Sequence, residues 1–216
     1  LLGDVEGLGD RGVEVQDAWR VEDAAGDVSI GGIGGGGAAD LLETLNDGCS
    51  ATLGSLTTAI GRTTHTGEDN VFFVPKSWVS RTGLTDHAVA LVEGEGVRDF
   101  SIDAETQVLF PYDKISAQVI RTVPSALGQH LWSYRRLLKE RSDFGNYIED
   151  RGLLWYEHSM FFPDRYRTPL GISFAEVATH NHFVLDRGGK VFKQTAPVIK
   201  LPAGATEDEH LGLLGL

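Results

Sequence analysis

The chain has 216 residues, of which 41% are apolar and 23% charged, a composition that gives one large globular domain enough material for a core. No stretch approaches the roughly 18 consecutive apolar residues of a membrane-spanning helix, so a membrane partner is not expected. Cys49 is the single cysteine, which excludes a disulfide framework within the chain and fits a reducing, cytoplasmic setting.

The formal net charge of −12 argues against a nucleic-acid partner, but the charge is unevenly distributed. Residues 1–50 hold eleven acidic and two basic side chains, whereas residues 121–200 hold eight acidic and twelve basic ones. Because the field at a partner depends on the local arrangement of charge, the basic segment leaves nucleic-acid binding open. The chain begins without Met and ends in an apolar run, LGLLGL, so we expect a piece of a longer protein.

Residues 1–37 predict an acidic connector, because glycine at this density offers little core and much backbone freedom. Within them the spacing Gly-x-Gly-x-x-Gly occurs at Gly32, Gly34 and Gly37, as in a dinucleotide-binding turn. The apolar piece before it is too short for a strand, and no ribose-binding acid stands out about 20 residues further on. The connector interpretation is therefore favoured over a nucleotide site.

Residues 38–216 predict a mixed α+β domain. AADLLETLNDG at 38–48 has the apolar spacing of a helix that ends at a glycine, and TLGSLTTAI at 52–60 fits either a helix or a short strand. Short apolar runs at 71–74, 89–92 and 107–110 predict strands of a mixed sheet.

The basic half of the chain contains the clearest helix. It covers residues 125–144, begins after Pro124 and carries an apolar stripe of leucines. Strands are predicted within LGISFAEVA at 170–178 and HFVLDRGGKVFKQ at 182–194, the second folded as a β-hairpin with DRGGK as its turn.

The stretch GRTTHTGEDN at 61–70 raises the question of a phosphate-binding loop. It lacks the Gly-Lys-Ser/Thr ending and has no lysine to reach a phosphate, so nucleotide hydrolysis is not expected. Two interpretations stay open. The stretch is either a polar turn before a core strand, or a loop whose N–H groups, hydroxyls and imidazole bind a phosphate or a base edge.

His180, Asn181 and His182 spell a motif associated with metal nucleases. Two histidines at i and i+2 share one face of a strand without closing a site, and the chain contains no Cys-x-x-Cys or His-Glu-x-x-His pattern. We therefore expect no metal site.

Aromatic side chains accompany basic ones between residues 132 and 167. Arginines with aromatics can bind nucleic acid through phosphate contacts and base stacking. The alternative is that most of these aromatics form core and that RRLLKER is the solvated face of a helix.

Six stretches taken in order resemble the target recognition domain of large adenine-specific DNA methyltransferases. They are TLGSLTTAIGRTTHTGEDNVFFV, VLFPYDK, PSALGQHLWSYRRLLKERSDF, LLWYEHS, PLGISFAEVATHNHFVLDRGG and LGLLGL. The stretches resemble those of the methyltransferases of phage growth limitation, or BREX, systems and of the type IIG restriction-modification enzymes. The resemblance covers roughly residues 50–216 and implies a target-recognition-domain-like α+β fold.

The resemblance also implies that DNA recognition and catalysis lie in separate domains. Such enzymes methylate adenine N6 with S-adenosylmethionine, using an Asn-Pro-Pro-Tyr motif in a separate domain, and this chain has no such motif. We therefore expect no catalytic residue and no cofactor within the chain, with S-adenosylmethionine held elsewhere in the parent enzyme. The expected partners are double-stranded DNA and the methyltransferase domain of the same parent chain.

A recognition domain needs polar side chains on loops of a rigid scaffold to read base edges in the major groove. The candidates, expected to meet on one concave face, are Arg62, Thr64, His65, Arg151, Arg165, Arg167, His180, Asn181, Lys190 and Lys193. The alternative function is a protein-interaction or scaffold domain that uses the acidic front of the chain as its contact surface and does not touch DNA.

Overall fold

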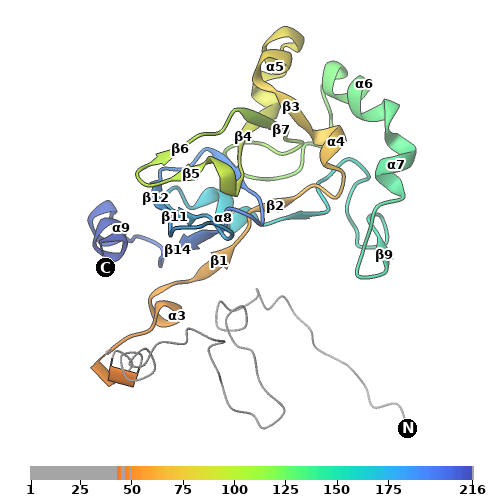
Figure 1. The fold of residues 1–216 in the computed structure, drawn as a ribbon. Helices are drawn as coiled ribbons and strands as arrows, with labels where there is room; N and C mark the ends of the chain where they lie inside the picture. The colour runs from red at the N-terminus through yellow and green to blue at the C-terminus, as the bar shows by residue number, and fades with distance from the viewer. Residues whose placement is uncertain (1–42, 45–46, 49, 216) are drawn as a thin grey trace, which may run out of the picture.

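The computed structural model describes residues 43–44, 47–48 and 50–215. The predicted connector at 1–37 and most of the helix predicted over 38–48 lie outside the described residues. In the described part, short helices alternate with short strands (Figure 1), which confirms the predicted α+β class. No helix of this part has both the length and the apolar character needed to cross a membrane.

Two four-stranded sheets organise the described residues. The first is antiparallel and takes the order β1 (Ala59–Gly61), β14 (Val198–Lys200), β11 (Gly171–Phe174) and β12 (Phe183–Asp186). The second is mixed and takes the order β13 (Lys190–Phe192), β4 (Ala88–Val92), β7 (Thr106–Leu109) and β3 (Phe73–Pro75). In the second sheet β13 runs parallel to β4, and the other two pairings are antiparallel.

Three two-stranded ribbons complete the strands of the described part. They are β2 (Thr64–His65) with β10 (Met160–Phe161), β5 (Val97–Arg98) with β6 (Ser101–Ile102), and β8 (Ser142–Asp143) with β9 (Asn146–Tyr147). The β8–β9 ribbon projects from the body below the helices of the green segment (Figure 1).

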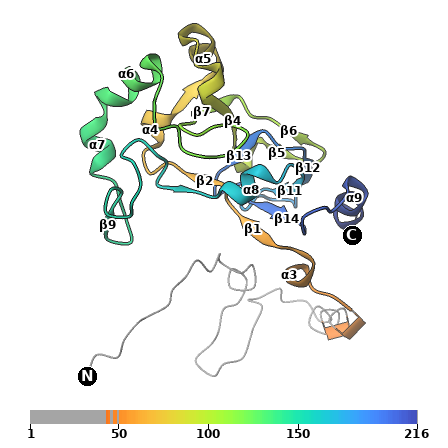
Figure 2. The same cartoon turned by 180° about the vertical axis from the view of Figure 1, so that it is seen from behind.

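The helices lie around the two sheets. They are α3 (Leu53–Leu56), α4 (Asp69–Phe72), α5 (Lys76–Thr82), α6 (Ser125–Ser133), α7 (Arg135–Lys139), α8 (Pro163–Arg167) and α9 (Glu207–Leu214), with single 3₁₀ turns at Thr85–His87 and Gly94–Gly96. Helices α6 and α7 stand beside the mixed sheet, and α9 packs near β12 at the far end (Figures 1 and 2).

The main core lies between the mixed sheet and helices α4 to α7. Its fully buried members include Phe72, Leu91, Leu109, Phe110, Leu127, Leu131 and Leu138. A smaller core joins the two sheets and contains Val92, Val97, Val184, Phe192, Ala196 and Val198. Each large apolar side chain withdrawn from water in this way stabilises the fold by about 1.5–3 kcal/mol.

The strands predicted at 89–92 and 107–110 are confirmed as β4 and β7, whereas the strand predicted at 71–74 is half wrong. Its first two residues end helix α4, where the Glu68 carbonyl accepts the N–H groups of Val71 and Phe72. A short apolar run fits a buried helical turn as well as a strand, so periodicity could not separate the two.

The helix predicted over 125–144 is shorter than expected and broken. It bends at Tyr134, which separates α6 from α7, and it ends at Lys139. The last residues of the prediction form strand β8 instead. For residues 52–60 each of the two alternatives holds in part, because α3 is followed by β1.

The predicted β-hairpin at 182–194 is wrong. Its turn exists, with Gly188 and Gly189 at φ of 87° and 72° and the Gly188 N–H donating to the Asp186 carboxylate at 2.9 Å. The strands on either side then diverge, because β12 pairs with β11 in one sheet and β13 with β4 in the other. This turn therefore carries the chain between the two sheets.

Candidate nucleic-acid interface

The segment at 62–66 is built into the scaffold through its backbone and its threonine side chains. The Thr63 N–H donates to the Phe192 carbonyl at 3.0 Å, and the Phe192 N–H donates back to the Thr63 hydroxyl at 2.6 Å. Strand β2 follows at once and pairs with β10, with Thr64 opposite Phe161. Thr63, Thr64 and Thr66 are buried, so their polar groups face the interior and not a ligand.

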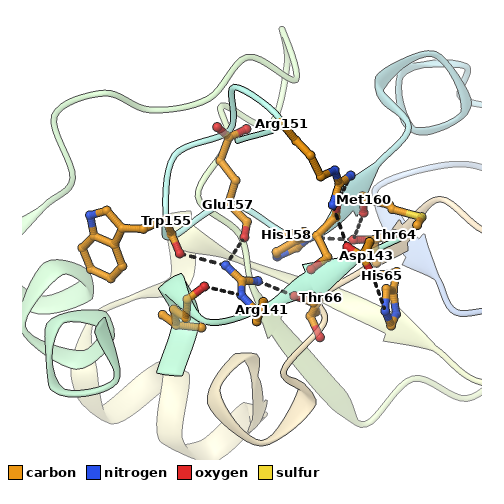
Figure 3. A network of polar contacts seen from close by, with 12 residues as sticks. Thr64, His65, Thr66, Arg141, Asp143, Arg151, Trp155, Glu157, His158 and Met160 are labelled. Carbon is orange, nitrogen blue, oxygen red and sulfur yellow. Dashed lines mark hydrogen bonds and ion pairs between the residues drawn. The ribbon is translucent and has the colours of Figure 1, made fainter. Parts of the chain in front are cut away.

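Thr64 is bonded to a buried histidine (Figure 3). His158 is fully enclosed, and its Nε2 lies 2.9 Å from the Leu109 carbonyl while its Nδ1 lies 2.6 Å from the Thr64 hydroxyl. A carbonyl only accepts, so Nε2 carries the proton and the Thr64 hydroxyl donates to Nδ1. Burial lowers the pKa of His158 to about 4, which keeps the ring neutral at physiological pH.

Arg141 is the second centre of this interior network (Figure 3). Its guanidinium donates to four backbone carbonyls, those of Leu138, Thr66, Trp155 and Glu157. Burial lowers the pKa of Arg141 to about 10, so the group stays charged at neutral pH. Its fork therefore fixes the end of α7, the 62–66 segment and the 155–157 segment relative to one another.

A partly exposed group of three arginines and one histidine lies beside this network. Arg151 forms an ion pair with Asp143 at 2.6 Å and donates to the Ser159 carbonyl at 2.7 Å. His65 Nε2 is 4.0 Å from the same Asp143 carboxylate. Burial, followed by the nearby Arg62 cation, lowers the pKa of His65.

Helix α8 brings Arg165 to the same group. Its guanidinium lies 4.4 Å from the centre of the Phe162 ring and donates to the Arg62 carbonyl at 2.9 Å. Gly61 has a φ of 144°, and a Cβ there would lie 3.1 Å from Arg165 Nη1, so this approach requires glycine. Arg62 in turn places Nη2 3.3 Å from the Met160 sulfur.

We call Arg62, His65, Arg151 and Arg165 the cationic edge. These four of the ten candidates are brought together by β2, β10 and α8, with Thr64 buried beneath them. Thr64 is thus corrected from a displayed side chain to an interior one, since His158 occupies its hydroxyl.

The remaining candidates do not join the cationic edge. Arg167 is exposed and pairs with Asp164 at 2.6 Å. Lys190 pairs with Asp186 at 2.7 Å, and Lys193 lies between two carboxylates, Asp69 at 3.0 Å and Glu93 at 3.1 Å. Such pairing reduces the positive charge that these two lysines offer to a partner.

His180 and Asn181 are exposed in the loop between β11 and β12. The neighbouring His182 lies 3.3 Å from Asp99, which places the end of this loop beside the β5–β6 ribbon. That ribbon and β9 lie at opposite ends of the molecule in both views (Figures 1 and 2). The expectation of one face for all ten candidates is therefore wrong, and contact with DNA stays a prediction for each of them.

A groove of about 460 Å³ runs beside the cationic edge. Its lining includes Phe144, Arg151, Glu157, Met160, Phe161 and Phe162. Burial raises the pKa of Glu157, whose carboxylate accepts the Leu154 N–H at 2.7 Å. Among the described residues, no three side chains of the types that bind metals gather into a group that could hold an ion.

Sequence reasoning missed the interior roles of Arg141 and His158. Arg141 sits in a basic run that predicted a solvated helix face, and nothing in the sequence separates it from Arg135 or Arg136. His158 lies 94 residues from its partner Thr64, so no local spacing could reveal the pair.

No protein-family model matches the chain. The chain is similar to a curated protein that is an adenine-specific methyltransferase. That relative is PglX of Streptomyces coelicolor, and the two sequences are 38% identical over 183 residues, or 83% of this chain. The chain spans only 15% of the length of PglX, so it corresponds to one segment of that enzyme.

Proposed function

We propose that this chain is the DNA target recognition module of an adenine-specific DNA methyltransferase that acts in phage defence or restriction-modification. The proposal is supported by the similarity over 183 residues to one segment of PglX, together with the ordered stretches that resemble a target recognition domain. On this proposal the partners are double-stranded DNA and the methyltransferase domain of the parent enzyme, which holds S-adenosylmethionine.

The cationic edge supports this function chemically. Guanidinium and imidazole groups donate to phosphates and to base edges, and arginine reads guanine through two parallel hydrogen bonds. Among the described residues, Arg62 has no carboxylate within 4.0 Å, so its charge is available to a phosphate. The buried bonds of Arg141 and His158 hold the strands beneath the edge, which gives the rigid mounting that base readout needs.

A chimera tests the proposal. The matching segment of Streptomyces coelicolor PglX is replaced by this chain, and methylated adenines are mapped by sequencing. We expect the chimera to methylate a different DNA site from PglX itself. An active chimera that still methylates the original site shows that recognition lies elsewhere, and the proposal is then wrong.

The net charge of −12 favours a second candidate, a protein-interaction domain. Salt separates the two functions, because a protein that contacts several phosphates loses affinity for DNA steeply as salt rises. We expect the affinity for duplex DNA to fall by about tenfold or more between 50 and 200 mM salt. At a fixed salt concentration, we expect Arg62→Ala to bind the duplex more weakly than the wild type. Arg81→Ala, in helix α5 and outside the cationic edge, is the matched control.

A further inference from the structure

The β8–β9 ribbon ends in an unusual turn. Phe144 and Gly145 are its two central residues, with φ of 53° and 83°, so both have the left-handed conformation of a type I′ turn. This conformation suits Asn, Asp or Gly at the first position and costs free energy for a bulky side chain. The Phe144 side chain is nevertheless 90% exposed, so burial within the described residues does not offset that cost.

The ribbon is firmly mounted on the scaffold. Arg141 precedes it and is held by four carbonyls, and Ile148 follows it, is fully buried and donates its N–H to the Arg141 carbonyl at 3.1 Å. Asp143 is tied to Arg151 from the side at 2.6 Å. The β8–β9 ribbon that carries Phe144 at its turn projects from the body in Figure 1.

The charges beside the turn are largely paired with one another, and the cationic edge lies next to them. Asp143 is paired with Arg151, and Glu149 with Lys139 at 2.7 Å, so two of the three carboxylates between residues 143 and 150 are neutralised. His65 lies beside the same Asp143. Minor-groove proteins combine an inserted apolar side chain with arginine and lysine contacts. Here the ring lies beside the cationic edge, in which Arg62 has no carboxylate within 4.0 Å among the described residues.

A second ribbon of the same molecule provides a contrast. Phe100, in the two-residue turn of the β5–β6 ribbon, also has a positive φ, 65°, and is 88% exposed. Its neighbours along the chain include one basic residue, Arg98, and five acidic ones, Glu93, Glu95, Asp99, Asp103 and Glu105. A phosphate backbone is repelled there, so exposure of the ring alone does not select the site.

We infer that Phe144 is a wedge that inserts its ring at a base step of the duplex beside the cationic edge. The inference rests on the proposed function. An enzyme that modifies adenine must take the base out of the stack, and a ring that occupies the vacated step lowers the cost of that movement. Phe144 also lines the groove that contains Phe161 and Phe162, which places further aromatic side chains near the ring.

The experiment uses Phe144→Asn in the PglX chimera, with a duplex that carries the mapped site and 2-aminopurine at the step next to the target. Asparagine favours the left-handed conformation, so the turn persists while the ring is removed. We expect wild type to raise the 2-aminopurine fluorescence. We expect the variant to lose that rise and to bind the duplex about tenfold or more weakly, as when one stacked base is lost.

Phe144→Trp and Phe100→Asn are the matched variants. Tryptophan keeps an aromatic face and is expected to retain the fluorescence rise, and Phe100→Asn is expected to match wild type in both measurements. A Phe144→Asn protein that binds and unstacks like wild type overturns the inference and leaves the proposed function standing. If Phe144→Asn binds DNA like the wild type but binds the methyltransferase domain more weakly, the ring is a contact between protein domains. That result also overturns the inference. If wild type does not bind the duplex at all, the proposed function itself fails.

Discussion

Residues 62–66 and residues 179–182 are both rich in threonine and histidine, but only the first stretch is tied into the interior. Thr63, Thr64 and Thr66 are buried and bonded to residues far away in the sequence. In the second stretch Thr179 bonds only its neighbour His180, at 3.1 Å, and both are exposed. Burial of the bonds, and not the composition, decides which stretch supports the scaffold, because His182 also contacts a distant residue, Asp99, but at the surface.

The largest effect is expected where the first stretch meets Arg141. Changing Arg141 to Met removes a donor from four buried carbonyls, and each buried acceptor left without a partner costs about 1–3 kcal/mol. We expect the free energy of unfolding, measured with urea, to fall by about 3 kcal/mol or more. Arg136→Met is the control, since that side chain is 92% exposed and its loss changes stability by about 0.5 kcal/mol or less. Equal effects of the two changes would contradict the role of Arg141.

The pH dependence of stability is expected to follow His158. Its folded pKa of about 4 lies below the unfolded value of 6.5, so the unfolded chain binds the proton more readily. The stabilisation is therefore complete above about pH 6.5 and declines as the pH falls toward 4, by about 3 kcal/mol in all. We expect urea unfolding of the wild type to show this decline between pH 7 and 4.

His158→Gln is the matched variant for this measurement, because glutamine does not titrate. Other groups contribute equally to both proteins, so the difference between the two curves isolates the histidine. Parallel curves would show that His158 is not the titrating group.

A smaller effect is expected from the hydroxyl that faces His158. Thr64→Val keeps the shape of the side chain and removes the donor to Nδ1, which we expect to cost about 1–2 kcal/mol. Thr179→Val makes the same chemical change in the exposed stretch and should cost less than about 0.5 kcal/mol. Similar losses at the two positions, measured by urea unfolding, would remove the distinction between the stretches.

These stretches also show how far the sequence predicts the fold. Strands β4 and β7 and the start of α6 at Ser125 were predictable, because a continuous apolar run and a proline before a helix act locally. Strand β2 was not, since it has two residues and pairs with β10, whose partner Phe161 lies far along the chain from Thr64. The turn at 186–190 was recognised, but no local signal shows that its flanking strands enter different sheets.

The candidate site was predictable in part for the same reason. Residue type pointed to Arg62, His65, Arg151 and Arg165, which the fold gathers, and equally to His180 and Asn181, which it places near the opposite end. What sequence could not supply is burial. The sequence does not distinguish a buried arginine that supports the strands, such as Arg141, from a partly exposed one at the edge, such as Arg151. Contacts between residues far apart in the chain make that difference.

The smallest change in stability is expected in the exposed loop, where function and folding can be separated most cleanly. His180→Ala combined with Asn181→Ala removes two exposed side chains, and we expect the free energy of unfolding to change by about 0.5 kcal/mol or less. In the PglX chimera, methylation mapping then asks whether this loop reads bases. Because the loop lies far from the cationic edge, we expect the mapped site to be unchanged, whereas Arg62→Ala weakens methylation at it. If the loop substitutions change the methylated DNA sequence and Arg62→Ala has no effect on methylation, the surface that reads bases lies at the opposite end of the molecule.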